Sequence, residues 1–256
     1  MLAPGRAFSE SERRAIAAAS FVVTPQSIGA RAYAQCRALN RNVFPDYSSR
    51  FGFEGKVGNF RLFRDFGLPH PETLAYAGAL DFSAAHPDHR RPPFPFPFVI
   101  KEDQGGGGNG VFRIGNPAEL GAALARIGPR PLVAQRFVRH KGSDLRVVIL
   151  WDRFYPYWRV QDNPEEFRNN VGRGARIAFN FEPDLTLAGV RAAADFSRRT
   201  GINCAALDIL FDRASPASAP LLGEVNFVFG RKGMGGSKRF RKLFRDAVAR
   251  WMKSQS

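Results

Sequence analysis

The spacing of hydrophobic residues changes repeatedly along the chain between a helical period and a strand-like alternation. Apolar side chains three or four positions apart predict amphipathic helices. These helices are expected at residues 9–19, 29–39, 56–67, 116–128, 184–201 and 237–253. Short apolar runs between turn residues predict strands. The runs are residues 21–24, 68–76, 98–103, 111–114, 131–138, 204–212 and 219–229, with a hairpin over residues 144–161.

Specific residues mark several of these boundaries. Asn116 is expected to cap the helix that follows it, with Pro117 at the first helical position. Gly67 is expected to close another helix, because glycine readily adopts the left-handed conformation found there. The long hairpin is expected to turn at Trp151–Arg153. The chain therefore mixes helices and strands along its whole length.

The composition indicates a globular protein with a substantial core. Of the 256 residues, 44% are hydrophobic and 24% are charged, which suffices for one large or two modest domains. Cys36 and Cys204 are too few for a disulfide framework, so a reducing, cytoplasmic location is expected. No apolar run is long enough to predict a membrane-spanning helix.

The charge of the chain is strongly basic and unevenly distributed. The formal net charge is +15, and residues 231–256 carry nine Lys or Arg against one Asp. A charge of this size attracts polyanions, which leaves two interpretations of the terminal helix. Its basic residues either bind nucleic acid or another anionic surface, or they form the solvated face of a packed helix. The second interpretation is favoured.

The segment QGGGGNG, residues 104–110, places five glycines between two predicted strands. A P-loop requires Lys-Ser/Thr after its last glycine, but Val111 and Phe112 follow here. A dinucleotide-binding fingerprint requires a helix next, whereas VFRI favours a strand. The run therefore predicts a hairpin tip that closes over a polyphosphate, with Lys101 adding a cation to glycine N–H groups. A flexible surface turn is the simpler alternative.

Polar residues interrupt two apolar runs near the end of the chain. Asp208 lies in CAALDILFD, and Glu224 and Asn226 lie in LLGEVNF. Strand alternation places Glu224 and Asn226 on one face, and Asp208 joins them if the two strands pair. Two carboxylates and an amide oxygen suit Mg²⁺, which prefers oxygen ligands. Solvated polar residues at strand ends are the alternative.

The order of these motifs resembles the ATP-grasp superfamily, and most closely its RimK-type carboxylate–amine ligases. The motifs are Lys101, the glycine run, AQRFV at 134–138, DLR at 144–146, FRNNVGRGA at 167–175, LDILF at 207–211 and EVN at 224–226. The resemblance covers about residues 50–230. It implies an α+β fold in which two α/β subdomains sandwich ATP.

The resemblance also implies a division of the chain. Residues 51–256 would form the ATP-grasp domain, with a glycine-lid subdomain at about 70–135 and a metal-binding subdomain at about 136–256. Residues 1–50 would form a short N-terminal α/β segment. This segment replaces the complete α/β domain that such ligases carry ahead of the ATP-grasp domain.

The cofactors implied by the resemblance are ATP and two Mg²⁺ ions, or Mn²⁺ in their place. Lysines would hold the α- and β-phosphates, the strand at residues 135–138 would read adenine through its backbone, and Asp144 would reach the ribose. The residues expected to bind ATP are Lys56, Lys101, Gly106, Gly107, Gly108, Asn109, Gly110, Gln135, Arg136, Phe137, Val138 and Asp144. The expected metal ligands are Asp208, Glu224 and Asn226.

The activity implied by the resemblance is the ATP-dependent joining of a carboxylate to an amine. The carboxylate would attack the γ-phosphate to give an acyl-phosphate, and the amine would then displace phosphate. Arg146, Arg168 and Asn170 would face the γ-phosphate and the acyl substrate. The positive net charge favours an acidic substrate. A phosphoryl transferase acting on a small molecule would use the same ATP site and is the alternative.

Overall fold

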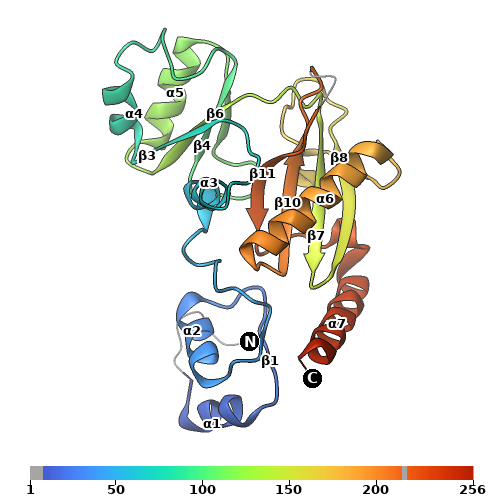
Figure 1. Ribbon diagram of the computed structural model, residues 1–256. Helices are drawn as coiled ribbons and strands as arrows, with labels where there is room; N and C mark the ends of the chain where they lie inside the picture. The colour runs from blue at the N-terminus through green and yellow to red at the C-terminus, as the bar shows by residue number, and fades with distance from the viewer. Residues whose placement is uncertain (1–7, 215–217, 256) are drawn as a thin grey trace.

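Two antiparallel sheets form the framework of the protein, whose computed structural model describes residues 8–214 and 218–255 (Figure 1). One sheet has the strand order β3 (Thr73–Tyr76), β6 (Leu132–Arg136), β4 (Phe98–Glu102), β5 (Val111–Ile114). The other has the order β11 (Leu221–Asn226), β10 (Cys204–Leu210), β7 (Ser143–Leu150), β8 (Arg153–Val160), β9 (Arg176–Ala178). Neighbouring strands are antiparallel throughout both sheets.

Helices pack against each sheet and lie between them. Helices α4 (Ala79–Ala85) and α5 (Pro117–Ile127) lie against the four-stranded sheet, and α6 (Pro183–Thr200) crosses the five-stranded sheet (Figure 1). Helix α3 (Gly55–Asp65) contacts β6 of the first sheet and β11 of the second. The two sheets therefore face a common space that α3 borders on one side.

The N-terminal part of the chain packs on the larger sheet. It contains α1 (Glu10–Ala18), α2 (Ala30–Leu39) and a parallel pair of short strands, β1 (Val22–Val23) and β2 (Val43–Phe44). Tyr33 and Tyr47 belong to the hydrophobic cluster of the five-stranded sheet. Phe44 lies 5.3 Å from Trp251 of α7 (Gly236–Ser254), measured between ring centroids. The N-terminal segment thus shares its core with the C-terminal half.

The four-stranded sheet has a separate core of its own. Phe82 from α4, Phe98 and Ile100 from β4, and Leu120 from α5 are fully buried there. Burying a large apolar side chain contributes roughly 1.5–3 kcal/mol, so this cluster gives the smaller sheet its own stabilisation. The cavity described below lies between this core and the core of the five-stranded sheet.

The local signals in the sequence are confirmed where they were specific. The Asn116 side chain accepts a hydrogen bond from the Glu119 N–H at 3.0 Å and caps α5. Gly67 has φ +60° just after α3, and Trp151 has φ +60° in the β7–β8 turn. All the predicted helices are present, and the mixed α and β architecture is confirmed.

Three short elements were not predicted from the sequence. They are β2, α4 and β9, which are two, seven and three residues long. Segments this short hold too few residues to display a periodic pattern. They form because neighbouring strands and helices supply their hydrogen bonds and packing partners.

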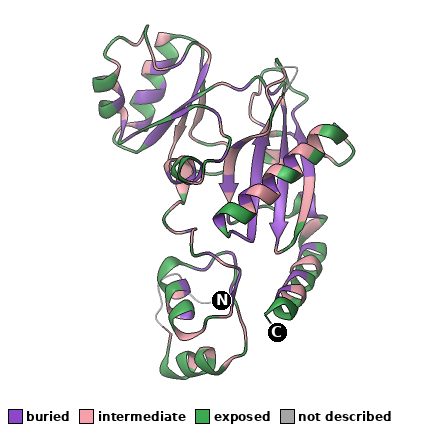
Figure 2. Cartoon of the chain, in the orientation of Figure 1, coloured by how far each residue is buried: buried purple, intermediate pink, exposed green. Residues whose placement is uncertain are grey.

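The terminal helix has the predicted two-sided character. Phe240 and Trp251 of α7 are buried, whereas Lys238, Arg241 and Lys242 are exposed (Figure 2). Within residues 8–214 and 218–255, no helix combines the length and the hydropathy needed to cross a bilayer.

Candidate functional site

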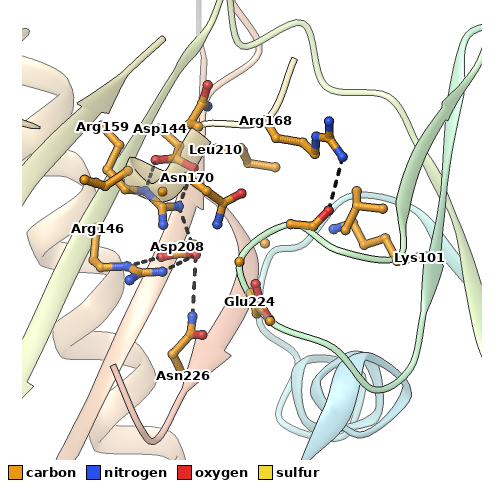
Figure 3. A pocket seen from close by; sticks show the side chains of 18 of the residues that line it. Lys101, Asp144, Arg146, Arg159, Arg168, Asn170, Asp208, Leu210, Glu224 and Asn226 are labelled. Carbon is orange, nitrogen blue, oxygen red and sulfur yellow. Dashed lines mark hydrogen bonds and ion pairs between the residues drawn. The ribbon is translucent and has the colours of Figure 1, made fainter. Parts of the chain in front are cut away.

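A cavity of about 520 Å³ lies between the two sheets (Figure 3). The smaller sheet contributes the ends of β4 and β6 and the glycine tip, which we define as residues 105–110. The larger sheet contributes residues of β7, β8, β10 and β11. The loop 167–172 and the segment 228–233 complete the lining.

Two lysines line the cavity from the side of the smaller sheet. Lys101 lies near the end of β4, and Lys56 lies in the first turn of α3. Burial lowers the pKa of Lys101 to about 8; the carboxylate of Glu224 opposes this shift, and Lys56 adds to it. The Lys56 Nζ atom donates to the carbonyl of Gly105 at 3.0 Å and lies 3.9 Å from Glu224 Oε1. These cations make the wall suitable for an anion with several oxygens.

Asp208 lies opposite the lysines, in the centre of the larger sheet. Strands β10 and β11 pair so that Asp208 faces Glu224 and Ala206 faces Asn226. Arg146 donates to Asp208 Oδ1 at 2.6 Å and to Oδ2 at 2.7 Å (Figure 3). Burial alone would raise the pKa of Asp208, but the arginine charges outweigh it and hold the pKa at about 2. Asp208 is therefore a permanent anion.

A second buried arginine joins Asp208 to Asp144. Arg159 is 4% exposed and donates to both carboxylate oxygens of Asp144, at 2.7 and 2.6 Å. Its Nη2 atom also lies 2.9 Å from Asp208 Oδ2. Two carboxylates thus neutralise Arg146 and Arg159 in the interior, which is the condition under which charges are tolerated there.

The predicted metal ligands supply hard oxygen donors on one side of the cavity. Glu224 has a side chain 36% exposed, and Asn226 donates from its amide nitrogen to Asp208 Oδ2 at 3.5 Å. Within the described part of the chain, no cluster of three or more His, Cys, Asp and Glu could hold a metal ion. Two carboxylates and one amide oxygen fit Mg²⁺, which commonly completes its shell with substrate phosphates.

The glycine tip is held against the loop 167–175 by long-range contacts. Gly107 and Gly108 have φ values of +66° and +79°, in the region that other residues rarely adopt. The Arg168 Nη1 atom donates to the carbonyl of Gly108 at 3.3 Å, and the Arg173 Nε atom donates to that of Gly107 at 3.1 Å. The tip is therefore folded over one side of the cavity.

Replacing Gly108 with alanine is expected to release the tip from this loop. A Cβ atom there would lie 2.6 Å from Asn170 Oδ1, and the positive φ would cost a further 1–2 kcal/mol, roughly. We expect cleavage of the tip by a protease of broad specificity to become at least about 5-fold faster, because cleavage tracks the open population. Gly106→Ala is the matched control, since nothing lies within 4 Å of its Cβ position. Equal rates in both variants would contradict the prediction.

Solved structures similar to this one share its fold. A RimK domain ATP-grasp protein from Sphaerobacter thermophilus matches with a TM-score of 0.57 and 17% identity, over 89% of this chain and 86% of that chain. N5-carboxyaminoimidazole synthase from Aspergillus clavatus, in complex with ADP and 5-aminoimidazole ribonucleotide, matches with a TM-score of 0.61 and 14% identity, over 86% and 56%. No protein-family model matches the chain.

Sequence comparison points to the same group. A probable alpha-L-glutamate ligase 1 from Shewanella amazonensis is 31% identical over 108 residues, which is 41% of this chain and 33% of that protein. The chain has the ATP-grasp fold, and the curated sequences that it matches include probable glutamate ligases. It spans 32–44% of the length of the first glutamate ligases that it matches.

The ATP-grasp cavity gathers nearly all the residues that the sequence singled out. The lining residues among them are Lys56, Lys101, Gly106, Gly107, Gly108, Asn109, Gln135, Arg136, Phe137, Val138, Asp144, Arg146, Arg168, Asn170, Asp208, Glu224 and Asn226. Gly110 does not line the cavity. Its carbonyl accepts from the Glu102 N–H at 2.8 Å, which extends the β4–β5 ladder instead.

Several predicted residues have partners that the sequence did not suggest, among them Asp144, Arg168 and the pair Arg146–Asp208. Both carboxylate oxygens of Asp144, expected near a ribose, accept from Arg159. Arg168, expected near the γ-phosphate, donates to both oxygens of Glu166 at 2.6 and 2.7 Å. Their roles toward a ligand stay predictions, but each is also part of an internal ion pair.

Sequence reasoning missed several residues of this ATP-grasp site. Arg159 lies opposite Asp144, but the expected hairpin turn left this register open by one residue. Tyr157 and Lys232 also line the cavity, and a Cβ on Gly233 would come within 2.2 Å of the Tyr157 ring. The sequence suggests that the Lys and Arg residues of the segment 227–240 point at an acidic substrate, and Lys232 of this segment lines the cavity.

Proposed function

We propose that this protein is an ATP- and Mg²⁺-dependent ligase that joins a carboxylate to an amine through an acyl-phosphate. The observation that carries the proposal is the convergence of three groups on one cavity. The lysine pair and the glycine tip lie on one wall, and Asp208, Glu224 and Asn226 lie on the other. The similarity to glutamate ligases and to ATP-grasp structures supports the same activity.

In this proposal, ATP lies between the two sheets. The backbone of residues 135–138 binds adenine, Lys56 and Lys101 neutralise the α- and β-phosphates, and the glycine tip covers them. Asp208, Glu224 and Asn226 hold Mg²⁺, which supplies Lewis-acid stabilisation of phosphate charge. Both reacting groups, the carboxylate and the γ-phosphate, are anions, so the cationic wall reduces their mutual repulsion.

The remaining part of the cavity suits an acidic substrate. Arg146 and Lys232 line this part together with Tyr157 and Phe229. The tip excludes water from the site when it is folded down, which protects an acyl-phosphate from hydrolysis. The net charge of +15 favours approach of an anionic substrate to this site.

We also propose that the chain divides as the family resemblance suggests. A glycine-lid subdomain extends over about residues 70–135 and a metal-binding subdomain over about 136–256, with a short segment at 1–50 ahead of them. The four-stranded sheet with its own core lies in the first range, and the five-stranded sheet lies in the second. Both facts support this division.

The direct test is ADP release from Mg-ATP in the presence of pooled amino acids and acidic peptides. The products are then identified by mass spectrometry. We expect substrate-dependent ADP together with a product formed by loss of water between a carboxylate and an amine. Glu224→Gln is expected to abolish ADP release with little loss of folding, because Glu224 is partly exposed.

The other outcomes of this assay identify the alternative functions. ADP with a product heavier by one phosphoryl group would establish the phosphoryl transferase. Absence of substrate-dependent ADP, combined with salt-sensitive binding of nucleic acid to the exposed basic face of α7, would indicate a binding protein. Either result would contradict the ligase proposal.

A further inference from the structure

Three basic side chains hold the glycine tip by donating hydrogen bonds to its carbonyl oxygens. Lys56 Nζ donates to the carbonyl of Gly105 at 3.0 Å, and the arginines described above take the carbonyls of Gly107 and Gly108. Arg173 also donates from Nη2 to the side chain of Asn109 at 2.8 Å. Arg173 therefore bridges Gly107 and Asn109, two residues apart in the tip, with a single planar group, as a guanidinium can and an ammonium cannot.

The carboxylate of Glu166 orients both Arg168 and Arg173. Glu166 accepts from Arg168 at 2.6 and 2.7 Å, and its Oε2 atom lies 3.6 Å from Arg173 Nη1. The hydrogen bond from Arg168 lowers the pKa of Glu166, so the carboxylate is ionised at neutral pH. We call Glu166, Arg168 and Arg173 the latch.

The latch leaves the tip's N–H groups free for a ligand. Carbonyl and N–H point in opposite directions across a trans peptide, so the carbonyls of Gly105 and Gly107, which accept from Lys56 and Arg173, turn the N–H groups of Gly106 and Gly108 away from these side chains. The Asn109 N–H donates to the carbonyl of Gly106 at 3.2 Å. Among the described residues, no hydrogen bond engages the N–H groups of Gly106, Gly107 or Gly108. Successive free N–H groups in a glycine turn form a concavity for anionic oxygens.

We infer that Glu166 and Arg173 are positioning residues that fix the glycine tip in its phosphate-binding conformation. This inference rests on the proposed function, because the phosphates belong to the nucleotide. It also assigns Arg168 to the tip through its bond to Gly108, in addition to any contact with substrate. Glu166 and Arg173 act through the tip, and neither of them lines the cavity itself.

The test measures the dissociation and association rates of a fluorescent ADP analogue with Mg²⁺ by stopped flow. We expect Arg173→Ala to raise the dissociation rate about 10-fold without lowering the association rate, because a loosened tip holds the phosphates less well but does not narrow the entrance to the cavity. Glu166→Gln should change the dissociation rate in the same direction by a smaller factor. Arg173→Lys should not restore the slow rate, because a lysine cannot span Gly107 and Asn109.

The matched control is Arg176→Ala, at the first residue of β9. Arg176 is exposed, pairs with Asp162 at 2.9 Å and makes no contact with the tip, so both rates should equal those of the unaltered protein. The midpoint of thermal unfolding should be unchanged in the Arg173 variants. A merely structural role would lower this midpoint and the association rate together.

Two results would overturn the inference, and they are distinguishable. If the unaltered protein binds the analogue and Arg173→Ala releases it at the same rate, the latch is wrong and the proposed function stands. If the unaltered protein binds no adenine nucleotide, the proposed function fails and the latch fails with it.

Discussion

Replacing Asp208 with alanine is expected to lower the free energy of unfolding by about 3–5 kcal/mol, because it leaves buried arginines without their partner. Asp208 is the ion-pair partner of Arg146 and one of the two partners of Arg159, and the side chains of Arg146 and Asp208 are 12% and 10% exposed. Thermal unfolding measures this loss as a fall of roughly 6–20 °C in midpoint for a protein of this size.

The effect of Asp208→Ala should hardly vary with pH above about 4. The pKa of Asp208 is near 2 in the folded protein and roughly 3.9 in an unfolded chain. A depressed folded pKa contributes stability that is fully present above the unfolded pKa and is lost as pH falls through the folded pKa. The difference between the unaltered protein and the variant should therefore shrink only between about pH 4 and pH 2.

Asp162→Ala is the control for this measurement. Asp162 pairs with Arg176 at 2.9 Å, but both side chains are more than half exposed, so the expected loss is within about 1 kcal/mol. Similar losses in both variants would contradict the assignment of Asp208 to a buried ionic core. Glu224→Gln separates the loss of turnover from the loss of stability. This variant should release no ADP, yet its midpoint of thermal unfolding should equal that of the unaltered protein.

Replacing Lys101 with methionine is expected to weaken the binding of Mg-ATP about 10- to 100-fold, because a hydrogen bond to a charged group contributes roughly 1.5–3 kcal/mol. In the unaltered protein, affinity should also fall as pH rises through 8. Only protonated Lys101 attracts phosphate, and its pKa of about 8 leaves roughly a tenth of it protonated at pH 9. Isothermal titration between pH 7 and pH 9 should thus show about a 10-fold loss of affinity.

Lys101→Arg keeps the positive charge at this position but removes its titration between pH 7 and pH 9. An arginine stays protonated across this range, so the variant should bind Mg-ATP with an affinity independent of pH between 7 and 9. Lys253→Met, at the exposed end of α7, should leave both affinity and its pH dependence unchanged. Equal pH dependence in the unaltered protein and in Lys101→Arg would contradict the role of Lys101.

Asp208→Ala and Lys101→Met change opposite walls of one site. The first is expected to lower stability, and the second to lower the affinity for Mg-ATP. Asp208 is fixed by two arginines and keeps its charge at every physiological pH. Lys101 is desolvated by burial and lies near the like charge of Lys56, so it changes its charge close to physiological pH. The wall of Asp208 therefore keeps its charges fixed across this range, whereas the wall of Lys101 does not.

Local patterns in the sequence determined where the helices and strands of this protein lie and which residues share a face of each. Helical and strand periods are properties of the backbone, so Asn116 could be placed at a cap and Glu224 and Asn226 on one face of a strand. The expected turn at Trp151–Arg153 left the register of the hairpin open by one residue, and the structure pairs Asp144 with Arg159. The glycine run and Lys101 favoured a phosphate site over a flexible surface turn, because glycine N–H groups and a lysine can bind the same anion.

Tertiary structure alone decided which charges meet. Asp208 is drawn to Arg146 because β10 and β7 lie side by side, although the two residues are 62 positions apart. Arg173 reaches the tip across 66 positions, and Lys232 reaches the cavity from the segment that follows β11. Spacing along the chain sets only which residues share an element. Long-range packing of the two sheets sets which charged groups come within hydrogen-bonding distance, and so decides that Arg173 holds the tip while Arg176 faces solvent.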